Sequence, residues 1–153
     1  EKRNPMKPES ELSKDFSLIL NRISNVDGHE KIENAMCNGT PDYTYTIDGI
    51  HGFIEFKCCQ MPKKDNTFIN LKHWTEPQRQ WMRNRFKSNT VFLVVRCGEY
   101  DFIFDTKIMF EVEKIPFGNL KNYAFNVSFK NKNYWEEVNL IILSNKLKGF
   151  NLI

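Results

Sequence analysis

The dipeptide Asp48-Gly49 is the feature that most constrains the fold of this chain. Asp-Gly between two strand-like segments is typical of a two-residue hairpin turn. If these residues form the turn, the flanking positions pair as 47 with 50, 46 with 51 and so on, each pair adding to 97. Because 42 and 55 also add to 97, this register places Asp42 directly across from Glu55, with side chains about 5 Å apart on one face.

Lys57 lies two residues beyond Glu55, so we expect it on the same face, about 6.6 Å further along the strand. Like charges directly opposite each other on a sheet are destabilising, so the Asp42–Glu55 pair needs an explanation. A divalent cation is the simplest one, since magnesium prefers one or two carboxylates together with waters and phosphate oxygens. A lysine beside such a site can orient or deprotonate an attacking water, or stabilise charge on the phosphate.

Four short segments in the first two thirds of the chain occur in an order typical of one group of nucleases. They are Lys31-Ile32-Glu33-Asn34, Gly39-Thr40-Pro41-Asp42, Phe53-Ile54-Glu55-Phe56-Lys57 and Thr75-x-x-Gln78-x-x-Trp81. Together they resemble the PD-(D/E)xK nuclease superfamily, and most of all its small VRR-NUC and phage resolvase-like members. The resemblance implies a restriction-endonuclease-like α/β core, with a mixed central sheet flanked by helices.

The same resemblance implies a chemistry for the hairpin residues. Asp42, Glu55 and the carbonyl of Phe56 would hold Mg²⁺, for which Mn²⁺ can substitute, and Lys57 would be the catalytic lysine. Each carboxylate also has an ordinary structural interpretation. Pro-Asp is common in turns, and Glu55 could simply pair with Lys57, which contributes only about 0–1 kcal/mol at an exposed site.

Two further site residues are implied by the resemblance and have competing interpretations. A glutamate on the first helix would be an additional metal ligand, and Glu11 matches best, with Glu9 and Asp15 as competitors. Acidic residues also favour helix N-termini through the helix dipole. Gln78 would contact the site or the DNA backbone, or would only close a capping box with Thr75. Glu33 and Asn34 would support the site or touch DNA.

Length and composition fit a single domain over residues 1–153. With the resemblance, we expect a nuclease domain in which residues 1–9 form a loose leader, 10–105 the catalytic core and 106–153 a C-terminal extension. The net charge of +3 permits nucleic-acid binding without requiring it. The four cysteines show neither a C-x-x-C pair nor a zinc spacing. The chain shows no signal peptide and no membrane-length apolar run, so we expect a cytoplasmic protein that is not membrane-bound. Basic residues follow the hairpin and are either a DNA-binding face or a solvated helix: Lys63, Lys64, Lys72, Arg79, Arg83, Arg85 and Lys87.

Local patterns predict the order helix, three strands, helix, strand. The first helix starts near Ser10 and ends at 25–28, and a capping box at Thr75 starts a second helix that runs to about Lys87. The apolar run 91–95 suits a strand buried on both faces. The remaining expected elements are strands at 31–36, 42–47, 50–57, 100–104 and 124–129, an irregular loop at 58–74, a short helix capped by Asp105 and a helix at 135–147.

The leading interpretation is a metal-dependent DNA endonuclease that hydrolyses phosphodiester bonds in branched, flapped or junction DNA. A four-way junction has two equivalent strands to cut, so we expect a homodimer. A sequence-specific restriction or intron-homing endonuclease of the same fold is the alternative within the same chemistry. A DNA-binding module that has lost catalysis is the alternative outside it.

Overall fold

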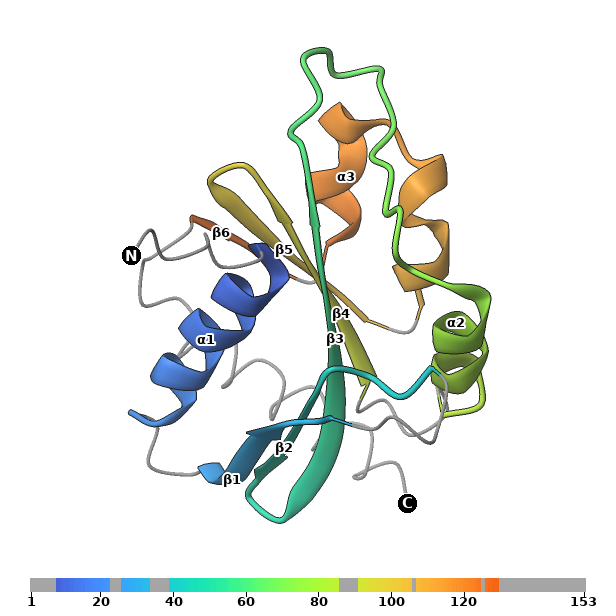
Figure 1. Cartoon of the computed structure of the whole chain (residues 1–153). Helices are drawn as coiled ribbons and strands as arrows, with labels where there is room; N and C mark the ends of the chain where they lie inside the picture. The colour runs from blue at the N-terminus through green and yellow to red at the C-terminus, as the bar shows by residue number, and fades with distance from the viewer. Residues whose placement is uncertain are drawn as a thin grey trace, which may run out of the picture.

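The computed structural model describes residues 8–22, 26–33, 39–85, 91–105, 107–124 and 126–129. Within them the chain is an α/β protein with a mixed sheet flanked by helices, as the sequence predicts (Figure 1). The elements are α1 (Pro8–Leu20), β1 (Val26–Lys31), β2 (Tyr43–Ile47), β3 (Ile50–Cys59), α2 (Glu76–Arg83), β4 (Val91–Cys97), β5 (Tyr100–Phe104), the 3-10 helix η2 (Met109–Lys114), α3 (Phe117–Tyr123) and β6 (Asn126–Phe129). No helix among these residues is long and apolar enough to cross a membrane.

The strands lie in the sheet in the order in which they occur along the chain, from β1 to β6. The central pair, β3 and β4, is parallel, and the pairs on either side of it are antiparallel. A parallel pair needs a crossover connection, and here the crossover contains α2. The loop 60–75 and α2 therefore return across one face of the sheet, directly above β3.

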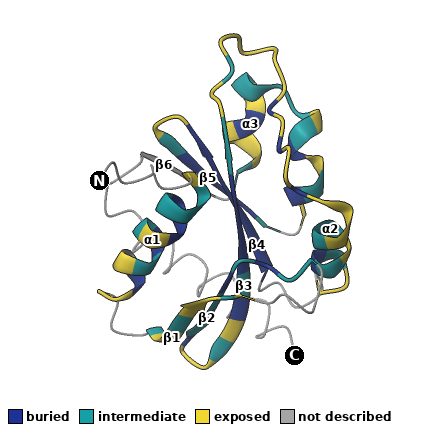
Figure 2. Ribbon diagram, in the orientation of Figure 1, coloured by how far each residue is buried: buried dark blue, intermediate teal, exposed yellow. Residues whose placement is uncertain are grey.

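Helices cover both faces of the sheet, and each face has its own core (Figures 1 and 2). Side chains alternate along a strand, so successive residues of β3 and β4 point to opposite faces. The α1 core contains Leu12, Phe16, Leu20, Tyr43, Tyr45, Ile47, Ile54, Phe56, Phe92, Val94 and Ile103. The second core lies under α2, η2 and α3 and contains Trp74, Met82, Val91, Leu93, Val95, Cys97, Phe102, Phe104, Met109, Val112 and Leu120, with Ile69 and Leu71 of the loop. Glu55 and Lys57 belong to this second face, because they pair with Leu93 and Val95.

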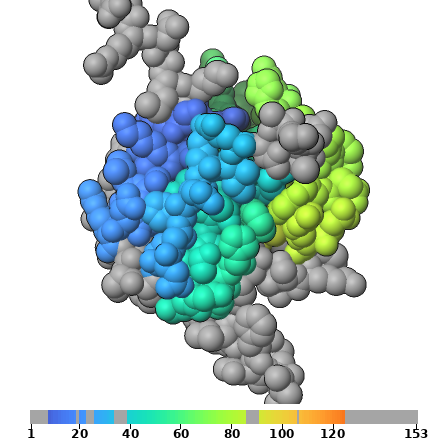
Figure 3. All heavy atoms as spheres, turned by 60° about the horizontal axis from the view of Figure 1, so that its bottom comes forward, coloured from blue at the N-terminus to red at the C-terminus, as the bar shows by residue number. Residues whose placement is uncertain are grey.

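The predicted hairpin register is confirmed. Asp48 and Gly49 have φ of 47° and 71°, as a two-residue turn of this kind requires. The pairing runs from Ile47 with Ile50 to Tyr43 with Ile54. Position 42 therefore follows directly on the last pair, opposite position 55. In Figure 3 this hairpin lies at the surface, with α1 and β1 on one side and α2 on the other.

The first helix and first strand differ from the sequence prediction. The first helix begins at Pro8, because proline suits the first turn of a helix, and its last residue is Leu20. The first strand is Val26–Lys31, so residues 26–28 extend β1 instead of ending the helix. Its position follows from pairing: β2 offers partners up to Tyr43, which pairs with Lys31. Residues 34–36 of the strand expected at 31–36 lie outside the described residues.

Later elements differ from the prediction as well. The capping box at Thr75 is confirmed, but α2 ends at Arg83 with Asn84 as its C-cap, and Lys87 lies outside the described residues. Asp105 caps the turn before η2: its side chain accepts the N–H of Lys107 at 2.9 Å and its carbonyl accepts those of residues 108 and 109. The N-cap of η2 itself is Ile108, which makes no side-chain cap bond. The sequence reading missed α3. The last expected strand is the shorter β6, and the helix expected at 135–147 lies outside the described residues.

Candidate active site

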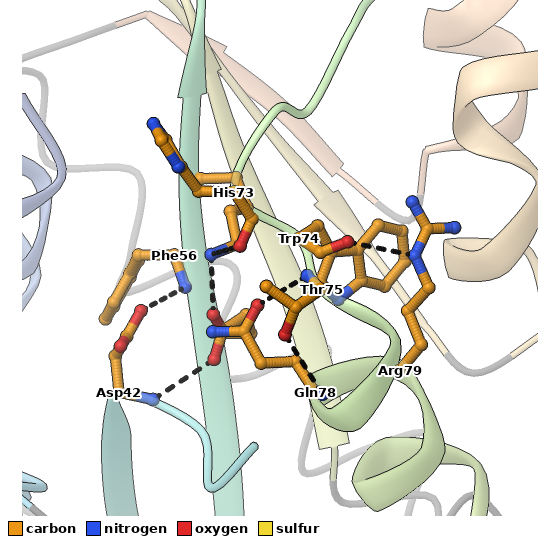
Figure 4. Close-up of polar contacts among 9 residues, drawn as sticks. Asp42, Phe56, His73, Trp74, Thr75, Gln78 and Arg79 are labelled. Atoms are coloured by element: carbon orange, nitrogen blue, oxygen red, sulfur yellow. Dashed lines mark hydrogen bonds and ion pairs between the residues drawn. The ribbon is translucent and has the colours of Figure 1, made fainter. Parts of the chain in front are cut away.

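Asp42 and Glu55 meet where the ladder between β2 and β3 ends. The backbone N–H of Asp42 donates to Oε2 of Glu55 at 3.2 Å, and the backbone N–H of Phe56 donates to Oδ2 of Asp42 at 3.3 Å (Figure 4). Each carboxylate thus takes the place of a backbone carbonyl and accepts an N–H group from the opposite segment. The structure brings the two predicted carboxylates together as the register required.

Lys57 lies against Glu55 on the same face, as predicted. Its Nζ is 2.9 Å from Oε1 of Glu55 and donates a hydrogen bond to the carbonyl of His73 at 3.1 Å. The side chains of Lys57 and Glu55 are only 4% and 0% exposed, so this is a buried ion pair. The cost of breaking such a pair depends on whether the partner left behind stays charged or takes up a proton.

The two carboxylates are hard to ionise together. Burial raises the pKa of Asp42 above its ordinary value, although the charge of Lys57 and the N–H of Phe56 act in the opposite direction. Burial, and then the charge of Asp42, raise the pKa of Glu55 to about 8 despite the nearby lysine. Oε1 of Glu55 is buried and accepts no hydrogen bond of good geometry from the described residues, even though the ammonium group lies within ion-pair distance. An additional positive charge, from a proton or a cation, would therefore compensate the two carboxylates.

A glycine brings the start of α2 against this site. Gly39 has a φ of 87°, which residues with a side chain rarely adopt. A Cβ atom there would lie 2.4 Å from the carbonyl oxygen of Pro77 and 2.9 Å from the backbone nitrogen of Gln78. The loop that leads into Asp42 therefore packs directly on the first turn of α2, which only a glycine permits.

Gln78 lies in the first turn of α2, against the loop that contains Gly39. Its side-chain Oε1 accepts the N–H of Thr75 at 3.0 Å, and its backbone N–H donates to the Thr75 hydroxyl at 3.5 Å, so the capping box is complete. Figure 4 shows the Gln78 side chain directed from α2 toward the Asp42 and Phe56 side of the site. The capping role is confirmed, and a role in catalysis or DNA binding stays a prediction.

The loop that anchors Lys57 is held on both sides of His73 by an ion pair that sequence reasoning missed. Glu113 of η2 accepts the backbone N–H of Leu71 at 3.1 Å and forms an ion pair with Arg79. Arg79 in turn donates from Nε to the carbonyl of Trp74 at 3.1 Å and lies 4.3 Å from the centre of the Trp74 ring. Glu113 lies more than 30 residues from both of its partners, and nothing in its local sequence indicates this contact.

A groove of about 520 Å³ opens beside Lys57. It lies between the end of β3, the loop 60–73 and the start of α1, and Glu9, Lys57, Cys59, Lys72 and His73 are among the residues that line it. Among the described residues, the β2–β3 pairing ends at Ile54, and beyond it the Phe56 N–H bonds to the Asp42 side chain. The groove therefore lies where the sheet pairing of β3 with β2 has ended.

The three acidic candidates on α1 have different surroundings. Asp15 forms an ion pair with Arg96 at 2.8 Å on the α1 face, so it is already engaged. Glu9 lines the groove beside Lys57. Glu11 lies in the first turn of the same helix, which packs on the opposite face of the sheet from Glu55 and Lys57. Its role as a further metal ligand stays a prediction.

The other residues singled out in the sequence have mainly structural partners. Arg79 pairs with Glu113, Arg83 pairs with Glu76 at 2.6 Å, and Arg85 lies 3.7 Å from the centre of the Trp81 ring. The predicted basic face is thus partly neutralised, whereas Lys63, Lys64 and Lys72 are exposed. Glu33 is exposed just after β1, and Asn34 lies outside the described residues.

The structure shows no preformed metal cluster in its described residues, and the sequence comparisons found no match. The described part of the chain contains no group of three or more histidine, cysteine, aspartate or glutamate side chains placed to hold a metal ion. Two carboxylates, those of Asp42 and Glu55, come together at this site. No family model and no curated protein sequence matches the chain.

Proposed function

We propose that the chain is a metal-dependent DNA endonuclease with a restriction-endonuclease-like core. The observation that carries the proposal is the contact of Asp42 and Glu55 across two strands, with Lys57 against Glu55. The order helix, three strands, helix, strand agrees with the core that the resemblance to PD-(D/E)xK nucleases implies. A purely structural pair of carboxylates would not be expected to combine burial, raised pKa values and an unsatisfied oxygen.

The residues fit a magnesium ion. Two carboxylates are a usual protein contribution to a magnesium site that also takes waters and phosphate oxygens. Two features support this proposal: Oε1 of Glu55 has no hydrogen bond of good geometry, and burial together with the neighbouring carboxylate raises the pKa of Glu55. The carbonyl of Phe56 and the carboxylate of Glu11 remain proposed additional ligands. When bound, the cation would neutralise phosphate charge and make a bound water more acidic.

The protein groups then have separate tasks. Asp42 and Glu55 would hold the cation, which would supply a positive charge for the substrate phosphate. An ammonium group has three N–H donors; Lys57 donates one to the His73 carbonyl and lies within ion-pair distance of Glu55. A further donor is available to a water or to a phosphate oxygen, where it would position the nucleophile and stabilise developing negative charge. Gln78, at the start of α2, would contact the DNA backbone beside this point.

The preference for branched, flapped or junction DNA is part of the proposal and rests on the resemblance to VRR-NUC and resolvase-like members. For a four-way junction, two copies of the chain related by a twofold axis would cut the two equivalent strands. The groove beside Lys57 could take a strand that leaves the duplex at a branch.

The test is a cleavage panel of labelled linear duplex, single-stranded, flapped and four-way DNA, with EDTA, Mg²⁺ or Mn²⁺. We expect cleavage with either cation, fastest on branched DNA, and a loss of at least about 10³-fold in Asp42→Asn and Lys57→Met. Asp48→Asn is the matched control, because it makes the same chemical change in the same hairpin and Asn-Gly preserves the turn.

Two outcomes would contradict the proposal. Full activity in folded Asp42→Asn and Lys57→Met would remove the site. DNA affinity without Mn²⁺ binding, measured by isothermal titration on the wild-type protein, would identify a DNA-binding module without catalysis. A single discrete cut in genomic DNA without junction preference would keep the chemistry and replace branched DNA by a recognition sequence.

A further inference from the structure

Two cysteines face each other at the ends of the parallel strands β3 and β4. Cys59 and Cys97 are the last pair in the register that begins with Phe53 and Val91. Their sulfur atoms lie 2.8 Å apart, on the face of the sheet that also carries Lys57. The contact joins two regular strands, so neither cysteine depends on an irregular segment for its position.

The backbone at this pair suits a disulfide without rearrangement. Neighbouring strands lie about 4.8 Å apart, within the range of about 4.4–6.8 Å that Cα atoms span in disulfides. The bonded sulfur distance is about 2.05 Å, so the two atoms have to approach by less than about 1 Å from their separation of 2.8 Å.

The two thiols also differ in the way that a redox pair requires. Cys59 is half-buried and lines the groove beside Lys57, whereas Cys97 is completely buried. A hydrogen bond from the Cys97 thiol lowers the pKa of Cys59, although burial acts in the opposite direction. Cys59 is thus accessible to a reagent in solution, whereas Cys97 is shielded from solvent and lies against Cys59.

The adjacent cysteine provides an internal comparison. Cys58 points to the opposite face of the sheet, where it packs against the α1 core. Burial and the nearby charge of Glu9 raise its pKa to about 12, so its reactive thiolate is scarce near neutral pH. Neighbours in the sequence therefore have very different expected reactivity.

We propose that Cys59 and Cys97 form a redox-active dithiol that a low-molecular-weight disulfide, such as glutathione disulfide, converts to an intramolecular disulfide. The Cys59 thiolate attacks one sulfur of glutathione disulfide, breaks its S–S bond and releases one glutathione thiolate. Cys97 then gives up its proton and attacks the Cys59 sulfur, which expels the second glutathione. Two electrons pass from the cysteine pair to glutathione disulfide, and the products are one protein disulfide and two glutathione thiols.

The bond would tie the end of β3 to β4 directly before the loop 60–75 begins. That loop supplies the His73 carbonyl that holds Lys57, so oxidation would restrain a segment that the site depends on. The proposal itself depends only on the thiols and does not require that the chain be a nuclease. Because the closed loop is long, with the two cysteines 38 positions apart, we expect the melting temperature to rise by roughly 10 °C.

The test uses the full chain, reduced with dithiothreitol, desalted and then incubated with glutathione disulfide. After denaturation and alkylation, mass spectrometry should show two alkylated cysteines in place of four, a loss of two hydrogens, and a single cross-linked peptide pair containing Cys59 and Cys97. Dithiothreitol should restore four alkylated cysteines. Cys58→Ser is the matched control and should still form the bond, whereas Cys59→Ser should not.

Three results would overturn the proposal: four alkylated cysteines after incubation, a stable glutathione adduct on Cys59 without release of the second glutathione, or a bridge that contains Cys58 or Cys37. Because Cys97 is buried, Cys97→Ala could unfold the protein, so the peptide map of the wild-type chain decides the pairing. In the Cys59→Ser variant, loss of the redox-dependent rise in melting temperature provides a second measurement.

Discussion

Two buried charge clusters, one on each face of the sheet, contain the same set of charges and differ in how they are connected. On the α1 face, Arg96 lies between Asp15 and Asp101. On the α2 face, Lys57 lies near Glu55 and Asp42. Each cluster has one cation and two carboxylates, so each carries a formal charge of −1 when fully ionised.

The Arg96 cluster is complete within the protein. Arg96 donates from Nε and a terminal nitrogen to the two oxygens of Asp101 at 2.7 and 3.0 Å, and from its other terminal nitrogen to Asp15 at 2.8 Å. Burial alone would lower the pKa of Arg96, but the bonds and charges of the two aspartates outweigh it and raise the pKa above its ordinary value. The planar, multiply donating guanidinium group satisfies both carboxylates at once.

The Lys57 cluster is not complete. An ammonium group is a compact donor, and here it contacts one carboxylate and one loop carbonyl, so Asp42 depends on a backbone N–H group. Both carboxylates have raised pKa values, and Glu55 keeps an oxygen without a hydrogen bond of good geometry. The two clusters therefore have the same charge composition and differ in the pattern of satisfied and unsatisfied oxygens.

Removing the positively charged side chain of each cluster should change the unfolding free energy most, and by different amounts in the two clusters. Arg96→Met leaves two carboxylates without their partner, one of them 2% exposed, and should cost about 3–5 kcal/mol of unfolding free energy. Lys57→Met should cost only about 1–2 kcal/mol, because Glu55, with its raised pKa, can take up a proton. Urea unfolding at pH 7 without divalent cations measures both. Equal losses would mean that the two clusters are energetically alike.

The core of the candidate site could be predicted from sequence because it depends on one local turn. Asp42 and Glu55 are 13 positions apart, and the Asp48-Gly49 turn determines which residues face each other between them. Lys57 then follows from the alternation of side chains along a strand. The capping box at Thr75 is local in the same sense, and it too is confirmed.

The supports of the site could not be predicted, since they depend on contacts between distant segments. No local pattern indicates that Gly39 packs on Pro77, or that Glu113 holds the loop around His73. The Arg96 cluster was also missed, because Asp15 and Arg96 are 81 positions apart. The limits of the first strand were wrong for a similar reason: they are determined by the partners that β2 offers and not by local propensity.

The clusters also differ in the backbone that carries their carboxylates, and the variant Gly39→Ala tests this difference. Asp15 and Asp101 lie on a helix and a strand, whereas Asp42 follows a loop that depends on Gly39. The added methyl group would meet the Pro77 carbonyl at 2.4 Å in a backbone with a φ of 87°. We expect a loss of about 2–3 kcal/mol and a fall in Mg²⁺-dependent cleavage.

The matched control for this variant is Gly28→Ala in β1. A Cβ atom there has no neighbour within 4 Å, so the unfolding free energy should change by no more than about 0.5 kcal/mol. Thermal and urea unfolding of both variants give the two losses. A harmless Gly39→Ala would show that α2 does not need to lie against the Asp42 loop.

The raised pKa of Glu55 predicts a pH dependence that distinguishes the clusters. Between about pH 4.5 and 8, folded Glu55 keeps a proton that the unfolded chain has released. The folded state therefore binds more protons, and stability without divalent cations should fall by up to about 1.4 kcal/mol per pH unit as pH rises through this window. Glu55→Gln should flatten this fall, whereas Asp48→Asn should leave it in place.

Magnesium should act on the same equilibrium. The cation binds the ionised carboxylates, so its apparent affinity should rise up to tenfold per pH unit below about pH 8, with release of close to one proton. Isothermal titration in buffers of different ionisation enthalpy measures the proton count. Metal binding that is independent of pH between 6 and 8 would show that Glu55 is already ionised, as a complete cluster would be.

The smallest expected effect concerns the loop that holds Lys57. Arg96 is held by groups on a helix and a strand, whereas Lys57 is held partly by a loop carbonyl. Glu113→Gln keeps the shape of the side chain but weakens its bonds to Leu71 and Arg79, which are partly exposed. We expect a loss of no more than about 1 kcal/mol in stability and a reduction of roughly 3- to 10-fold in cleavage rate, since the position of Lys57 becomes less defined. Glu111→Gln on the same 3-10 helix is the control, because its pair with Lys114 is exposed. Faster amide hydrogen exchange at residues 71–74 in Glu113→Gln alone would link the rate to the loop, and an unchanged rate with faster exchange would show that Lys57 is held by Glu55 alone.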